Sequence, residues 1–194
     1  VGGHPWLRAM RRRAEGLAVP GTGDARPTIV LFSQYERPER ERLLALVSEL
    51  QARVGARWRV ALKPHPRERD AAEWYAPAIA AGVELLPTDA DSYALLARCE
   101  VAVSVYSTIS IEALAFSCRS VVLRSERWTE AIVDLAAAGV LEVAEGAEDL
   151  AALLGRDAPE IGRDRAAREL FGIGEPELDY AALLDRLPVG AAGG

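Results

Sequence analysis

The sequence has little cysteine and no long apolar run. Only two cysteines, Cys99 and Cys118, occur among 194 residues, which is too few for the disulfide framework of a small secreted protein. No apolar stretch is long enough to span a bilayer, and no signal-peptide pattern is present. We therefore expect a cytoplasmic protein without a transmembrane segment. Because the chain begins at Val1 and not at methionine, we expect a piece of a longer parent, for which peripheral membrane association stays open.

Basic residues are also in the minority. The 23 lysines and arginines are outnumbered by 29 aspartates and glutamates, which gives a formal net charge of −6. The three arginines at 11–13 lie in a helical pattern and are interpreted as a solvated face. A protein that binds a phosphate backbone needs a basic surface, so we expect no nucleic-acid partner. No His or second Cys stands at metal-ligand spacing from either cysteine, so we expect no metal site and inert thiols.

Neither a glycine-rich phosphate loop nor a dinucleotide-binding fingerprint occurs. What the sequence does contain is a repeated alternation of apolar strands and amphipathic helices. Strands are expected at residues 28–32, 58–62, 83–86, 101–105, 120–123 and 140–143. Helices are expected directly after residue 108 and at 38–54, 70–81, 89–99, 126–138 and 147–154. This pattern predicts an α/β fold, a doubly wound, Rossmann-like parallel sheet of about six strands with helices on both faces.

Three residues set expected helix boundaries within this alternation. Asp89 is expected to cap the helix that begins there, Pro77 to kink or split the helix at 70–81, and Gly139 to end the helix that precedes it. The chain as a whole divides into four expected parts. These are an opening helix and linker at 1–26, a nucleotide-binding domain at 27–156, carboxyl-terminal helices packed back on it at 157–189, and a disordered tail at 190–194.

The turn between the strand at 101–105 and the following helix is the main candidate for a ligand site. Tyr106, Ser107 and Thr108 form this turn. The first turn of a helix exposes unpaired N–H groups and the positive end of the helix dipole, so it attracts phosphate. Ser107 and Thr108 can also be simple helix caps, and the two roles are compatible. Glu112 lies one turn further among apolar neighbours, which favours a position lining a cleft.

Two further strands end in polar or special residues. Gln34 follows the first strand. The loop after the second strand contains Lys63 and also His65, which stands between two prolines. In a parallel sheet the carboxyl ends of the strands share one edge, where ligands bind at the reversal of strand order. The flanking prolines stiffen the loop, which suits a ligand-binding histidine. A histidine that only packs against its loop, and a lysine that is a plain surface charge, remain alternatives.

Two motifs together resemble the carboxyl-terminal half of GT-B glycosyltransferases. Lys63-Pro-His-Pro66 is followed some forty residues later by Val103-Ser-Val-Tyr-Ser-Thr-Ile-Ser-Ile-Glu-Ala-Leu-Ala115. The opening five residues also resemble the segment where the chain enters that half, so the similarity spans roughly residues 1–155. The families most similar in pattern are capsule polysaccharide synthesis proteins, sialyl- and polysialyltransferases, and CDP-glycerol glycerophosphotransferases. The resemblance implies a single GT-B-type domain.

The resemblance also implies roles for individual residues. His65 is the expected catalytic residue and contacts the donor phosphate, while Ser107 and Thr108 bind phosphate and Glu112 takes the ribose hydroxyls. Lys63 and Gln34 complete the expected binding set. The donor is expected to be a CMP-, CDP- or UDP-linked sugar or polyol, with no other cofactor. The acceptor-binding half and its general base lie outside this chain in that scheme, so the chain alone is expected to be inactive.

One departure from the family pattern leaves other functions open. Residues 117–120 read Ser-Cys-Arg-Ser, where such families often have Gly-Lys-Pro. A fragment similar to UDP-N-acetylglucosamine 2-epimerase is a second interpretation, although the usual glycine-rich serine loop of those enzymes does not occur here. A non-catalytic, doubly wound ligand-binding module is a third. The first interpretation remains a donor-binding domain for surface or capsular polysaccharide synthesis.

Overall fold

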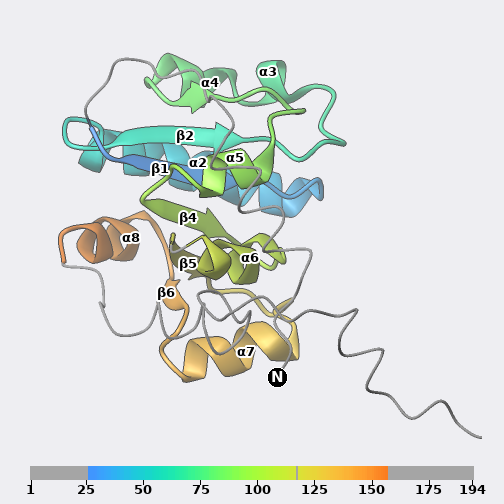
Figure 1. Cartoon of the computed structure of the whole chain (residues 1–194). Helices are drawn as coiled ribbons and strands as arrows, with labels where there is room; N and C mark the ends of the chain where they lie inside the picture. Colours follow the sequence, from blue (N-terminus) through green and yellow to red (C-terminus); the bar gives the residue numbers. More distant parts are fainter. Residues whose placement is uncertain (1–25, 117, 157–194) are drawn as a thin grey trace, which may run out of the picture.

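Six parallel strands form one sheet in the part of the chain that the computed structural model describes, residues 26–116 and 118–156 (Figure 1). In chain order they are β1 (Thr28–Phe32), β2 (Arg59–Lys63), β3 (Glu84–Leu85), β4 (Val101–Ser104), β5 (Arg119–Leu123) and β6 (Glu142–Ala144). Their spatial order is β3-β2-β1-β4-β5-β6, and every pairing is parallel. The predicted doubly wound sheet is therefore confirmed, and its strand order reverses between β1 and β4.

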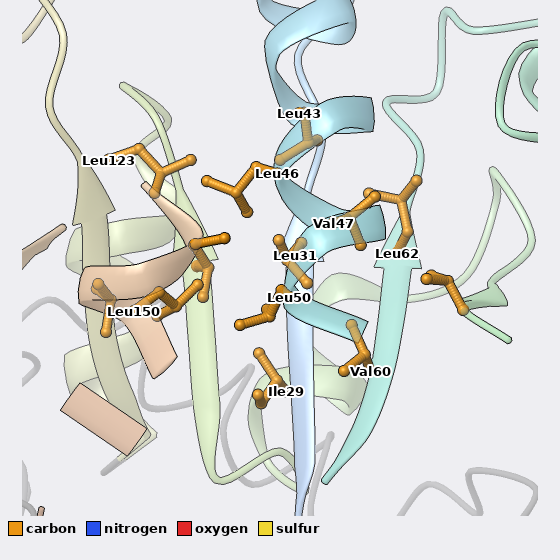
Figure 2. Packing of buried hydrophobic residues seen from close by; sticks show 14 of the residues in the cluster. Ile29, Leu31, Leu43, Leu46, Val47, Leu50, Val60, Leu62, Leu123 and Leu150 are labelled. Atoms are coloured by element: carbon orange, nitrogen blue, oxygen red, sulfur yellow. The ribbon is translucent and has the colours of Figure 1, made fainter. Parts of the chain in front are cut away.

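One face of the sheet is covered by the helices α2 (Arg37–Val54) and α8 (Ala147–Leu154). Apolar residues of α2 recur at helical spacing, so one side of that helix is buried against β1 and β2 (Figure 2). Leu50 from α2 and Leu150 from α8 are fully buried in this layer. On the sheet side, Ile29 and Leu31 point into the same layer because side chains alternate along a strand.

The opposite face carries α5 (Ser92–Leu96), α6 (Ile109–Ala115) and α7 (Glu130–Ala137). Val30 and Phe32 of β1 point to this side and are almost fully buried. The helix that follows β1 therefore lies on one face, and the helix that follows β4 lies on the other. The two connections diverge at the carboxyl ends of neighbouring strands, and ligands of doubly wound sheets bind at such a divergence.

Two predicted helix starts are wrong, and side-chain caps explain both. The helix expected from Asp89 begins at Ser92, because the Asp91 carboxylate accepts the N–H groups of Tyr93 and Ala94. The helix expected from residue 126 begins at Glu130, because the hydroxyl of Thr129 caps it. The carboxyl ends differ too, since these helices end at Leu96 and Ala137 and not at 99 and 138.

Other boundaries agree closely with the sequence patterns. The segment with Pro77 is split into α3 (Ala71–Trp74) and α4 (Ala76–Ala80), as predicted. Gly139 follows α7 with φ +69°, a conformation that favours glycine. The expected helices within 1–26 and 157–189 and the tail at 190–194 lie outside the described residues. Within the described ranges, no helix is both long and apolar enough to cross a membrane.

Candidate functional site

The loops after β1, β2 and β4 meet at the carboxyl edge of the sheet. The rings of Tyr35 and His65, from the first two loops, have centroids 5.3 Å apart. The Tyr106 hydroxyl, from the loop after β4, donates a hydrogen bond of 2.7 Å to Glu36. Residues from three strand ends are therefore in contact around the point where the strand order reverses. The contacts agree with the sequence-based expectation that these three loops share one edge.

His65 is held by its own loop. Its backbone N–H donates a 2.7 Å hydrogen bond to a carboxylate oxygen of Glu68, and the Glu68 N–H returns a bond of 2.9 Å to the His65 carbonyl. The ring atom Nδ1 accepts the N–H of Arg67 at 3.2 Å. Burial lowers the pKa of His65, and the cations Arg67 and Lys63 add to this, against the opposing charges of Glu68 and Glu36. The imidazole is thus fixed in position and favoured in its neutral form.

Glu68 is buried beneath this loop, with only 2% of its surface exposed. The Tyr75 hydroxyl donates a 2.9 Å hydrogen bond to it, and a second contact of 2.7 Å links that hydroxyl to Ser33 in the loop after β1. The Nε atom of Arg40, on α2, lies 2.8 Å from the Glu68 carboxylate as an ion pair whose N–H is not aligned for a hydrogen bond. Arg40 also pairs with Asp70 at 2.9 Å. The network ties the first two loops to α2.

Lys63 and Gln34 are both buried. Lys63 is only 3% exposed, and its ammonium donates to the carbonyls of Pro64 at 2.8 Å and Thr88 at 2.7 Å. Burial lowers the pKa of Lys63, although the charges of Asp89 and Glu68 oppose the shift. The bonds connect the loops after β2 and β3. Gln34 is 7% exposed at the end of β1. That these two residues bind a donor stays a prediction.

Tyr106, Glu36 and Arg127 form a cluster that the sequence analysis missed. Arg127 donates a 3.1 Å bond to the Tyr106 hydroxyl, and its guanidinium lies 5.0 Å from the centre of the Tyr106 ring. Burial raises the pKa of Tyr106, and the hydrogen bond and charge of Glu36 raise it further. The hydrogen bond from Tyr106 and the charge of Arg127 lower the pKa of Glu36, although desolvation opposes them.

A second arginine lies over an aromatic ring, in the loops after β2 and β1. The guanidinium of Arg67 is 5.1 Å from the centre of the Tyr35 ring. Arg67 and Arg127 are both exposed, so two solvent-accessible cations contact tyrosines of the loops after β1 and β4. These tyrosines and arginines could have been recognised from the sequence by their position, because each lies in the loop that follows β1, β2, β4 or β5.

The predicted hydroxyl residues lie at the start of α6. Ser107 accepts the N–H of Ile109 at 3.3 Å through its side-chain oxygen. Thr108 is the N-cap residue, but its side chain makes no capping hydrogen bond and is exposed. The hydroxyl of Ser110 donates 2.8 Å to the Ser107 carbonyl and fixes the turn. Of the two predicted hydroxyls, Thr108 is the more open to solvent. That either binds phosphate stays a prediction.

Glu112 is partly buried in the first turn of α6 and faces Tyr93 on α5. Burial raises the pKa of Tyr93 to about 12, and the charge and hydrogen bond of Glu112 contribute after it. Glu112 therefore lies between two helices on one face of the sheet. Its predicted contact with ribose hydroxyls is a further expectation that the geometry leaves untested.

The two cysteines lie next to each other, a proximity that the sequence analysis did not anticipate. Their sulfur atoms are 3.2 Å apart, and both thiols are free and buried. The hydrogen bond with Cys118 and burial raise the pKa of Cys99 well above its ordinary value, which disfavours the reactive thiolate. Among the described residues, no group of three or more His, Cys, Asp or Glu side chains is placed to hold a metal ion.

A cavity of about 490 Å³ lies apart from these loops. It is lined by Thr28 and Arg59 at the starts of β1 and β2, by Leu86 and Pro87 in the loop after β3, and by Leu95 and Cys99 in and just after α5. Its wall holds none of the residues that the sequence analysis selected for donor binding. The cavity is therefore an alternative place for a ligand, separate from the loops after β1, β2 and β4.

Comparisons with known proteins place the fold. The sequence matches no family profile and no curated protein. A structure described as a UDP-N-acetylglucosamine 2-epimerase from Listeria monocytogenes superposes with a TM-score of 0.63, over 87% of this chain and 47% of that one, at 19% identity. WaaG, a glycosyltransferase involved in lipopolysaccharide biosynthesis, gives a TM-score of 0.53 over 96% of this chain and 52% of WaaG, at 15% identity.

The similarity shows the fold alone at these identities. The chain spans about half the length of both proteins. It has a Rossmann-like α/β domain of the GT-B type, which corresponds to one half of each neighbour.

Proposed function

We propose that this chain is the donor-nucleotide-binding domain of a GT-B glycosyltransferase that builds a surface polysaccharide. The observation that carries the proposal is that Tyr35 contacts His65 and Tyr106 contacts Glu36, so that the two pairs link three strand ends at the reversal of strand order. A doubly wound sheet binds its ligand at this point. The fold similarity to WaaG supports the same conclusion.

The side chains at this carboxyl edge of the sheet suit a phosphate-bearing ligand. The imidazole of His65 offers a hydrogen-bond donor, and the exposed guanidinium groups of Arg67 and Arg127 offer positive charge. When a glycosidic bond to a nucleotide breaks, negative charge builds on the departing phosphate. Donors that are already in place stabilise that charge. The acceptor and the base that activates it belong, in this proposal, to a second half of the parent protein.

A second candidate function is a sugar epimerase acting on a UDP derivative. The similarity to the Listeria monocytogenes structure, at a TM-score of 0.63, favours this alternative. Of the carboxylates at this edge, Glu36 is engaged by Tyr106 and Glu68 by Arg40 and Tyr75. An epimerase should bind UDP and discriminate strongly against cytidine nucleotides.

The test is a calorimetric titration of the full chain with CMP, CDP, UMP, UDP and GDP. We expect one cytidine or uridine nucleotide to bind, and His65→Ala to weaken that binding at least tenfold. His4→Ala changes the only other histidine and is the matched control. A preference for CMP indicates a sialyltransferase-like parent, CDP indicates glycerol phosphate transfer, and UDP indicates a hexose transferase or an epimerase. Equal affinity of wild type and His65→Ala would contradict the proposed site.

A further inference from the structure

The carboxylate of Glu68 is buried directly below the loop that carries His65. Taking a carboxylate out of water is costly unless charges and hydrogen bonds compensate it. Here the compensation comes from Arg40, from the Tyr75 hydroxyl and from the backbone N–H of His65. The first two partners belong to the scaffold, whereas the third belongs to the candidate site. Glu68 therefore couples the rigid part of the domain to the histidine.

The ring of His65 is oriented by a second bond within the same loop. Its Nδ1 atom accepts the backbone N–H of Arg67 at 3.2 Å. A ring nitrogen accepts a hydrogen bond only when it carries no proton. The single ring proton of the neutral imidazole must then reside on Nε2, the nitrogen at the far end of the ring. A proton can reach Nδ1 only if the Arg67 bond breaks.

We propose that Glu68 is a positioning residue that holds His65 in the Nε2–H tautomer, so that the imidazole meets a phosphate oxygen as a neutral hydrogen-bond donor. The second half of this inference rests on the proposed function, whereas the tautomer is a property of the free protein. Two hydrogen bonds join the residues: the Glu68 carboxylate accepts the His65 N–H, and the Glu68 N–H donates to the His65 carbonyl at 2.9 Å. This pair of bonds closes the loop at both ends.

The charges around the ring agree with a neutral imidazole. Glu68 and Glu36 favour protonation, Arg67 and Lys63 oppose it, and burial opposes it most. The remaining neighbour is the ring of Tyr35, 5.3 Å away. The negative charge of Glu68 is largely balanced by Arg40, which is itself 8% exposed. Positive charge for a phosphate then comes from Arg67 and not from His65.

Nitrogen NMR spectroscopy tests the tautomer directly. A long-range proton–nitrogen correlation spectrum of the labelled full chain distinguishes a protonated ring nitrogen from an unprotonated one. Only His4 and His65 contribute, so His4→Gln assigns the signals. We expect Nδ1 of His65 to be unprotonated and Nε2 to be protonated at pH 7.5. A spectrum with the proton on Nδ1, or with an equal mixture of the two forms, overturns the inference.

Two variants test the part played by Glu68. Glu68→Ala removes the acceptor for the His65 N–H, so the two tautomers should mix. Glu68→Gln keeps an acceptor oxygen and should keep the Nε2–H tautomer. A residue that only stabilises the fold predicts an unchanged tautomer in both variants, and that result overturns the positioning role. The wild-type spectrum decides the tautomer even if Glu68→Ala does not fold.

A binding experiment tests the neutral-donor role. His65→Gln places an amide N–H donor near the position of Nε2 and carries no charge. We expect His65→Gln to keep nucleotide affinity within about threefold of wild type, while His65→Ala loses at least tenfold. Equal losses in both variants overturn the neutral-donor role. Because the spectra need no nucleotide, failure of the proposed function leaves the tautomer result intact, and the opposite tautomer leaves the proposed function intact.

Discussion

The hydrogen bond of 2.7 Å from Tyr106 to Glu36 joins the loops after β4 and β1 across the reversal of strand order. These two loops belong to helices on opposite faces of the sheet. The bond therefore links the two connections at the point where they leave the sheet in different directions. Arg127, which also contacts the Tyr106 hydroxyl, adds the loop after β5 to the same cluster. Three connections are held together by one phenolic group.

Replacing Tyr106 by Phe should loosen this cluster. We expect the free energy of unfolding at pH 7 to fall by about 1 kcal/mol, the usual value of one such hydrogen bond. The partnership lowers the pKa of Glu36, so its stabilisation is present above the unfolded-state pKa and is lost as the pH falls through the folded-state pKa. Urea unfolding at pH 7 and pH 3 should thus show the penalty shrinking at acid pH. A penalty that is equal at both pH values would mean that Glu36 is not the partner.

Lys63→Met should destabilise the loops after β2 and β3. The substitution leaves the buried carbonyl of Pro64 and the partly buried carbonyl of Thr88 without their donor, and we expect a loss of about 1–3 kcal/mol at pH 7. Burial lowers the pKa of Lys63, so the unfolded state binds more protons and wild-type stability rises with pH between the two pKa values. Lys63→Met should lack that alkaline rise. Chemical denaturation from pH 7 to 10 measures both effects. An unchanged free energy of unfolding in Lys63→Met contradicts the structural role.

His65 should contribute to the pH dependence of stability on the acid side of neutrality, between pH 7 and pH 5. Its folded-state pKa is lowered, so the unfolded state takes up a proton first as the pH falls below about 6.5. Wild type should lose this part of its stability between pH 7 and pH 5, and His65→Gln should not. The difference between the two unfolding curves isolates His65 from the carboxylates. Parallel curves would show that the imidazole is not perturbed.

Leu50→Ala tests the layer between α2 and the sheet. Leu50 is fully buried in the cluster with Ile29 and Leu31 (Figure 2), so its truncation leaves a cavity and should cost about 2–5 kcal/mol. Val133→Ala is the control, because that side chain is 48% exposed and its loss should change stability by less than about 0.5 kcal/mol. Calorimetric melting curves compare the two. Similar small changes in both would argue against the packing described.

The elements that the sequence predicted well are those defined by local pattern. The strand β1 and the helix α8 have the predicted bounds, because apolar periodicity and flanking residues define each of them. Asp89 and Asp91 both precede the same apolar run, and only the backbone bonds to Asp91 show which of them caps the helix. Helix starts depend on which of several nearby polar side chains reaches the backbone.

The organisation of the site depended instead on partners that are distant in sequence. Seventy positions separate Glu36 from Tyr106, and the ion pair of Glu68 is made with Arg40 on a different element. Sequence pattern gave the loops and the candidate His65, because strand ends are local features. It did not give the burial of Lys63 or the bond between Arg67 and His65, because both depend on how the loop closes.

The most direct test of the donor-site account is a map of nucleotide binding on the backbone amides. The full chain, labelled with ¹⁵N, is titrated with the nucleotide that binds best, and shifts are followed residue by residue. The account predicts the largest shifts in the loops at 33–36, 65–68 and 105–108 and at Arg127. Largest shifts around the separate cavity of about 490 Å³, at Thr28, Leu95 and Cys99, would contradict it, because the ligand would then bind away from the loops after β1, β2 and β4.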